Sequence, residues 1–144
     1  ALENKKVQER PVKQGKTKIR QRFFNYLLFQ KDGKILIEKR EKKDIWKHLF
    51  QFPLLEQNKN FETEPVHILK QITASFGSSP SHYIDLKKHI LSHQHIHARI
   101  WFFNSIPELE NKERYFKVKL TELDQYPLPQ LLNRFMEQND FHAT

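Results

Sequence analysis

Polar and apolar residues alternate along residues 95–103, HIHARIWFF. On a strand, the odd-numbered residues of this run would share one face, and the other face would carry Ile96, Ala98, Ile100 and Phe102. An alternation of this length is typical of a β-strand. Ser92 and His93 directly precede the run, at a hinge after a second predicted strand, Tyr83 to Ile90. We therefore expect this pair in a loop beside a strand, where sheet proteins often present the side chains that recognise a ligand.

Two further predicted strands flank a tight turn. Residues 19–29 are apolar and aromatic, and residues 34–39 carry Ile35 and Ile37 on one face. The Asp-Gly dipeptide at 32–33 is a strong hairpin signal, because glycine readily takes a positive φ. A β-hairpin is therefore expected. Pro53 follows an aromatic-rich segment and is expected to end a strand at a sheet edge.

Residues 63–77 have the best helical pattern in the chain. Thr63 can cap the helix, Pro65 suits its first turn and Gly77 ends it. Apolar residues fall at helical spacing, at Val66, Leu69, Ile72 and Phe76. We expect these residues to face the core.

The last third of the chain predicts a strand, a turn and a helix. Residues 114–120 alternate, residues 121–124 offer a capping-box start to a short helical turn, and residues 131–135 begin an amphipathic helix. Strands outnumber helices, and the helices fall singly between groups of strands. The predicted fold class is therefore α+β.

Composition favours one folded domain after a basic arm. The chain has 144 residues, 38% of them hydrophobic and 12% aromatic, which argues against a disordered chain. We interpret residues 1–18 as an interdomain connector and residues 19–144 as the domain. Cysteine is absent, which excludes disulfides, iron–sulfur clusters and cysteine-ligated zinc within this chain. No apolar run approaches the roughly 18 residues of a membrane span, so we expect a cytoplasmic protein without a membrane partner.

The net charge of +8 points to a polyanion as partner. Near the amino end, Glu3 and Glu9 are outnumbered by basic residues, namely Lys5, Lys6, Arg10, Lys13, Lys16, Lys18, Arg20 and Arg22. Such a segment can be a solvated tail. Nucleic-acid binding is the sharper interpretation, because a basic patch releases counterions from phosphates. Charge alone does not separate DNA from RNA or an anionic membrane.

No catalytic or metal site can be completed from the sequence. His89, His93, His95 and His97 lie close together, but no carboxylate stands among them and ligands from one strand give poor tetrahedral geometry. We therefore expect surface or groove histidines and no metal. His93 cannot easily act as a base for Ser92, because adjacent strand residues point to opposite faces. With three glycines in the chain, no phosphate-binding loop is recognised.

The order of hairpin, Phe-Pro segment, helix ending in glycine, strands, short turn and final helix resembles the Nudix fold. The resemblance implies a mixed β-sheet packed with two main helices. Active Nudix hydrolases carry the pattern G-x5-E-x7-R-E-U-x-E-E-x-G, and alignment on Gly77 keeps Glu62 and the apolar Ile72. The first glycine, the arginine and three carboxylates of the pattern are replaced by Glu56, Lys70, Gln71, Ala74 and Ser75. Because Mg²⁺ requires oxygen ligands, the comparison implies that the metal site and pyrophosphate hydrolysis are lost.

Four segments resemble, in order and spacing, the C-terminal domain of the MutY family of adenine DNA glycosylases. They are PVKQGKTKIRQRFFNYLLF from Pro11, IEKREKKDIWKHLFQFPLLE from Ile37, LSHQHIHARIW from Leu91 and LTELDQYPLPQLLNRF from Leu120. The resemblance implies a non-catalytic domain of a bacterial, nucleoid-associated base-excision-repair enzyme. That enzyme hydrolyses the N-glycosyl bond of adenine mispaired with 8-oxoguanine in double-stranded DNA. An upstream helical catalytic domain with an iron–sulfur cluster is also implied.

The same resemblance implies a recognition site. The family recognises 8-oxoguanine through a Phe-Ser-His loop, which Ser92 and His93 match, with Leu91 where phenylalanine is commoner. His48 stands where glycine is usual. Contacts to the DNA backbone or the catalytic domain are expected from Lys16, Lys18, Arg20, Arg22, Lys42, Lys43 and Lys47. Two alternatives stay open: a Nudix hydrolase of oxidised nucleotides with a relocated metal site, and a protein-docking module that contacts DNA incidentally.

Overall fold

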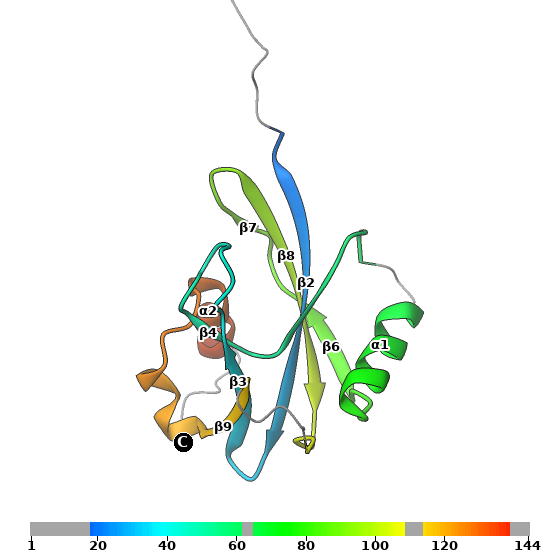
Figure 1. The fold of residues 1–144 in the computed structure, drawn as a ribbon, viewed down its shortest axis with the longest axis vertical. Helices are drawn as coiled ribbons and strands as arrows, with labels where there is room; N and C mark the ends of the chain where they lie inside the picture. Colours follow the sequence, from blue (N-terminus) through cyan, green and yellow to red (C-terminus); the bar gives the residue numbers. More distant parts are fainter. Residues whose placement is uncertain (1–17, 62–64, 109–113, 139–144) are drawn as a thin grey trace, which may run out of the picture.

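Two long strands lie side by side at the centre of the fold (Figure 1). The computed structural model describes residues 18–61, 65–108 and 114–138. Strand β2 (Arg20–Lys31) and strand β8 (Gln94–Phe103) run parallel and are paired along most of their length. The alternating run at 95–103 is therefore a strand, as predicted, and it starts beside the start of β2.

The sheet forks along β2. The end of β2 pairs with β3 (Lys34–Lys39) through the predicted hairpin, whose turn has Asp32 and Gly33 at φ 53° and 75°. The first half of β2 pairs instead with β5 (Leu54–Gln57), and Pro53 lies at the fork, directly before β5. The hairpin and the strand break at Pro53 are both confirmed.

Strand β3 pairs with two further strands, one on the edge that it shares with β2 and one on the opposite edge. Both β4 (Phe50–Gln51) and β9 (Tyr115–Lys119) run antiparallel to it. The predicted strand at 114–120 is therefore confirmed. With β2 and β5, these strands form the part of the sheet around the fork.

Two short strands complete the sheet along β8. β6 (His82–Asp85) and β7 (His89–Ile90) both run antiparallel to β8. The sequence predicted one continuous strand from Tyr83 to Ile90, and this is wrong, because the strand is interrupted at residues 86–88. As a result β7 and the start of β8 form a short hairpin, while the other edge of β8 stays paired with β2.

Helix α1 (Val66–Phe76) ends as predicted at Gly77, which takes φ 66° and donates its N–H to the carbonyl of Thr73 (2.8 Å). The predicted cap, Thr63, lies outside the described residues. Val66 does not face the core: it is 49% exposed, and Ile68 is buried in its place. The helix is therefore rotated relative to the predicted apolar face.

The final elements are η1 (Leu120–Gln125), a 3₁₀-helix, and α2 (Gln130–Gln138). The final helix is as predicted, but the capping box is not, because η1 starts directly after Lys119 of β9 and no side chain caps it. Across the described ranges, no helix has both the length and the apolar composition needed to cross a membrane.

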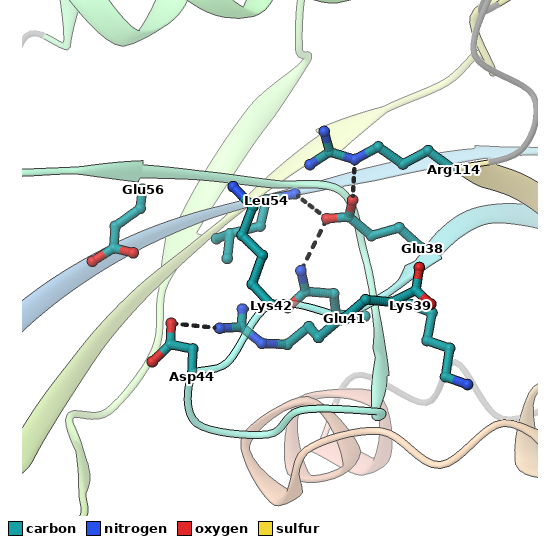
Figure 2. Close-up of a pocket in the computed structure, with 10 residues that line it drawn as sticks. Glu38, Lys39, Glu41, Lys42, Asp44, Leu54, Glu56 and Arg114 are labelled. Atoms are coloured by element: carbon teal, nitrogen blue, oxygen red, sulfur yellow. Dashed lines mark hydrogen bonds and ion pairs between the residues drawn. The ribbon is translucent and has the colours of Figure 1, made fainter.

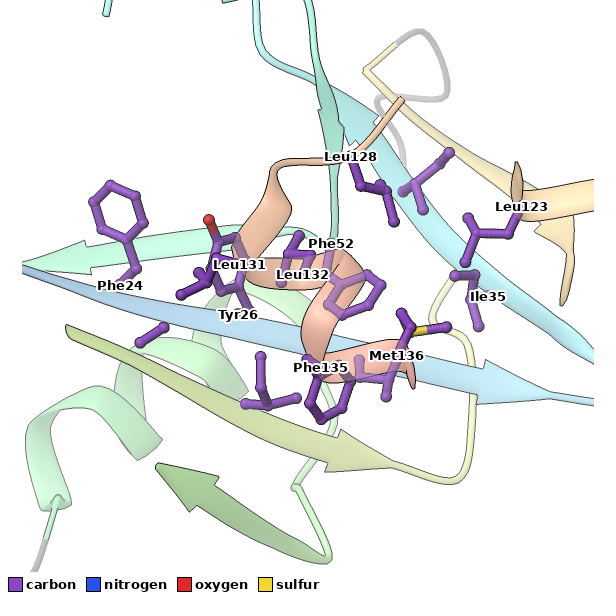
Figure 3. Packing of buried hydrophobic residues seen from close by; sticks show 14 of the residues in the cluster. Phe24, Tyr26, Ile35, Phe52, Leu123, Leu128, Leu131, Leu132, Phe135 and Met136 are labelled. Carbon is purple, nitrogen blue, oxygen red and sulfur yellow. The ribbon is translucent and has the colours of Figure 1, made fainter. Parts of the chain in front are cut away.

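Each face of the central sheet is covered by one helix. Figure 3 shows α2 packed on one face, where its buried side chains meet aromatic residues of the sheet; this cluster includes Phe24, Tyr26, Phe52, Leu131, Leu132, Phe135 and Met136. Helix α1 contributes to a cluster on the opposite face, with Ile68, Ile72, Phe76, Trp101 and Phe103. The predicted α+β class with two main helices is confirmed.

Candidate functional site

The predicted recognition residues form the turn of the β7–β8 hairpin. Leu91, Ser92 and His93 connect the two strands, and the Leu91 N–H donates to the Gln94 carbonyl across the turn (2.8 Å). The His93 carbonyl accepts a hydrogen bond from the Arg20 N–H (3.0 Å). Backbone bonds therefore hold the turn, while Ser92 and His93 are exposed.

Leu91 has different surroundings from its two neighbours. It is half-buried and packs against the core cluster that α2 covers. Its side chain therefore anchors the base of the turn. Ser92 and His93 are the residues of the turn that present exposed polar side chains.

Exposed basic residues gather at the same end of the molecule. Lys18 and Arg20 lie at the start of β2, beside the turn. The loop between β3 and β4 points toward the same end, at the top of Figure 1, and exposes Lys42, Lys43 and Lys47. Lys16 lies outside the described residues. Two separate segments thus bring positive charge to the end of the fold where the turn lies.

Arg22 does not belong to this exposed group. Its side chain is 4% exposed, and its guanidinium pairs in bidentate fashion with Asp44 (2.8 Å for both bonds) and with Glu56 (2.7 and 2.9 Å). A further bond goes to the Gln94 side chain (3.0 Å). A guanidinium has five N–H donors, and these bonds use all of them. We therefore assign Arg22 a structural role, which leaves its guanidinium without a free donor for the expected contact to the DNA backbone or the catalytic domain.

These ion pairs shift the pKa values of the groups that form them. Hydrogen bonds from Arg22 lower the pKa of Asp44 from 3.8 to about 2. The pKa of Arg22 is raised above its usual value, most by the hydrogen bonds to Glu56 and second most by those to Asp44. Arg40 adds another ion pair to Asp44 (2.9 Å). The partners of Arg22 lie 22 and 34 residues away in the sequence, so local pattern analysis did not connect them.

A charged cavity of about 370 Å³ lies at the fork of the sheet (Figure 2). Glu38 lines it and is 3% exposed. Its carboxylate accepts hydrogen bonds from Arg114 Nε (2.9 Å), Gln51 Nε2 (2.9 Å) and the Leu54 N–H (3.2 Å). The sequence signal, which we missed, is a glutamate on the same strand face as the buried Leu36. Because donors inside the protein satisfy this carboxylate, we assign Glu38 to fold stability.

Helix α1 corresponds to the helix that carries the metal-binding carboxylates in active Nudix hydrolases. In this chain the residues at those positions are not suitable ligands for Mg²⁺. Gln71, Ala74 and Ser75 occupy the positions of its three carboxylates. A cavity of about 180 Å³ near the start of α1 has no carboxylate among its described lining residues, which are Gln57, Asn58, Lys59, Pro65, His67, Ile68 and Gln71. Protein sites for Mg²⁺ usually supply one or two carboxylates. In the described ranges, no three potential metal ligands gather at one place.

His95 and His97 are bridged by the side-chain amide of Gln21. Its Nε2 lies 3.3 Å from His95 Nδ1, and its Oε1 lies 2.7 Å from His97 Nε2. Phe23 stacks on His97 with ring centroids 4.8 Å apart. Burial lowers the pKa of His97, helped by the positive charge of Lys88 and by His95. These histidines are therefore partly buried members of the sheet surface, and His95 lies next to the turn, opposite Ile90 of β7.

The chain resembles known proteins in sequence and in fold. The NUDIX domain family matches residues 25–138. The C-terminal domain of mouse MUTYH, solved in complex with human PCNA, has a TM-score of 0.62 at 11% identity, covering 85% of this chain and 90% of that domain. MutT, from work on Aliivibrio salmonicida and Vibrio cholerae, has a TM-score of 0.56 at 13% identity, covering 83% and 96%. The NUDIX domain of Shewanella oneidensis NrtR, solved with ADP ribose, has a TM-score of 0.59 at 13% identity, covering 90% and 92%. No curated protein sequence matches the chain.

At these identities the solved structures share the fold alone. They include both a MutY-type domain and MutT proteins, one of them described as a NUDIX hydrolase. The family match is broader evidence, because it extends from within β2 to the end of α2. The chain therefore belongs to the NUDIX domain family.

Proposed function

We propose that the chain is the non-catalytic C-terminal domain of an adenine DNA glycosylase and recognises 8-oxoguanine opposite the mispaired adenine. The observation that carries the proposal is the exposed Ser92–His93 turn, held by backbone bonds at an end of the fold rich in exposed lysine and arginine. An upstream domain with an iron–sulfur cluster would flip the adenine and hydrolyse its N-glycosyl bond. The likeness in fold to the mouse MUTYH domain supports this assignment.

Ser92 suits the hydrogen-bonding pattern of 8-oxoguanine. Guanine presents N7 and O6 as acceptors, whereas the oxidised base has a carbonyl at C8 and a donor at N7. A serine hydroxyl can both donate and accept, so it can pair with this reversed edge. We assign His93 to a contact with the base or a neighbouring phosphate. A correct two-point contact gives about 1–3 kcal/mol of discrimination.

Replacing Ser92 and His93 by alanine in the full-length enzyme is expected to lower the preference for 8-oxoguanine over guanine opposite adenine by about 5- to 150-fold. The measurement is adenine release from two duplexes that differ in that purine alone. Lys18→Ala combined with Arg20→Ala is the matched control, because loss of phosphate contacts weakens both duplexes alike and flattens the salt dependence. An unchanged preference in the Ser92/His93 variant would remove the turn as the recognition site.

A Nudix hydrolase of oxidised nucleotides is the second candidate, favoured by the likeness in fold to MutT and by the charged cavity at the fork. We expect the chain not to hydrolyse 8-oxo-dGTP in the presence of Mg²⁺, because Gln71, Ala74 and Ser75 supply no carboxylate. Release of pyrophosphate or phosphate measures this, with an active Nudix hydrolase as positive control. Robust turnover would establish the hydrolase instead.

Equal binding of lesion-bearing and normal duplexes would favour protein docking, as in the PCNA complex of the mouse domain.

A further inference from the structure

The loop between β3 and β4 holds two side-chain-bearing residues in a left-handed conformation. Trp46 has φ 58° and His48 has φ 75°. A Cβ makes this region unfavourable, because it approaches the following carbonyl oxygen. Such residues persist where their surroundings fix them, and they concentrate at functional sites.

Arg40 and Asp44, which both precede Trp46, fix the loop through bonds to His48 and to β2. The Arg40 carbonyl accepts a hydrogen bond from the His48 N–H (2.6 Å). The Arg40 guanidinium binds Asp44 (2.9 Å), and Asp44 is paired in turn with Arg22 on β2. The backbone of the loop is thus fixed around Trp46, and this determines where its indole ring lies.

The indole of Trp46 lies between β2 and the β7–β8 hairpin. Its ring is 6.2 Å from the Phe24 ring on β2 and 5.8 Å from the His89 ring on β7, with interplanar angles of 81° and 62°. Edge-to-face contacts of this kind are favourable for aromatic rings. Burial lowers the pKa of His89, as does the charge of Arg134 on α2, so the neutral imidazole that packs on the indole is favoured.

Strand β7 has few other attachments among the described residues, although β8 beside it is paired with β2. β7 is two residues long and pairs with β8 alone in this part of the chain. Two residue pairs with β8 are its only strand pairing in the described ranges, so the Trp46 contact is a large share of what holds it. His89 lies three residues before Ser92 in the sequence. Because His89 and Ser92 are so close in the sequence, a displacement of β7 would also displace the turn.

We propose that Trp46 is a positioning residue: the strained loop holds its indole against His89 and thereby keeps the Ser92–His93 turn in the orientation that reads 8-oxoguanine. The inference rests on the proposed function and deepens it. Recognition contacts require their groups within about 0.5 Å of the productive geometry, which a free two-residue strand does not ensure. Trp46 acts through His89 and needs no contact with DNA.

Amide hydrogen exchange on the 144-residue chain tests the positioning step. In Trp46→Ala, the Leu91 amide is expected to exchange about tenfold faster, while amides paired between β2 and β8 keep their rates. Trp46→Phe keeps a ring and should restore most of the protection. His48→Gly is the matched control, because it relaxes a left-handed residue of the same loop and keeps the indole. No change at Leu91, or equal acceleration across the whole sheet, overturns the inference.

Adenine release by the full-length enzyme tests the recognition step. Trp46→Ala is expected to lower the preference for 8-oxoguanine over guanine by about 2- to 10-fold, as for the loss of one aromatic contact, and Trp46→Phe should restore it. His48→Gly should leave the preference unchanged. If the Ser92/His93 variant loses the preference and Trp46→Ala keeps it, the positioning role fails and the proposed function stands. If neither variant alters the preference, both fail.

Discussion

Replacing Arg22 by methionine is expected to lower the free energy of unfolding by about 3–5 kcal/mol at neutral pH. The guanidinium is 4% exposed and lies between Asp44 and Glu56, so its removal leaves two neighbouring carboxylates without their shared partner. Urea denaturation measures the loss. Lys18→Met, which removes an exposed charge near the start of the same strand, should change stability by less than about 0.5 kcal/mol.

The loss caused by Arg22→Met should depend on pH. The pKa of Asp44 is lowered from 3.8 to about 2, chiefly by hydrogen bonds from Arg22, so its carboxylate contributes stability above about pH 4 that is lost as the pH falls toward 2. The difference between wild type and variant should therefore narrow by about 2 kcal/mol over this range. Asp44→Asn should show the same reduced acid sensitivity. A difference that stays constant from pH 7 to pH 2 would contradict the structural role of this ion pair.

Elements defined by local pattern were predicted well. The alternation at 95–103 and the Asp32–Gly33 turn depend on neighbouring residues, and both have the predicted structure. The interruption at 86–88 was missed, because it depends on how two short strands share β8. The phase of α1 was also missed at Val66, since it is set by distant sheet residues such as Trp101. The strand break at 86–88 and the buried face of α1 therefore depend on long-range packing, which the local sequence pattern does not contain.

The candidate site also combines features that the local sequence predicts with features that depend on distant residues. The exposed position of Ser92 and His93 follows from the strand that they precede. Arg22 was grouped with the basic arm, although it lies on the same face of β2 as Phe24 and Tyr26, which are buried. That alternation was the available signal. The left-handed Trp46 had none, because the loop around it is held by bonds that include a pair between Asp44 and the distant Arg22.

Replacing Phe135 by alanine is expected to destabilise the fold by about 3–5 kcal/mol. Phe135 is 1% exposed, and its ring lies 6.1 Å from Phe52 at the fork and 6.0 Å from Phe102 on β8. It therefore joins α2 to two parts of the sheet that are distant in sequence. Thermal or urea unfolding followed by circular dichroism measures the loss.

The matched variant Phe135→Leu distinguishes packing from aromatic contact. Leucine fills much of the volume, so we expect a loss below about 1.5 kcal/mol if burial dominates. A loss for leucine close to that for alanine would assign the effect to the ring contacts with Phe52 and Phe102. A small loss for alanine would mean that α2 is not part of the cooperative core. In that case one face of the sheet would be stable without its helix, contrary to the packing of Leu131 and Met136 against it.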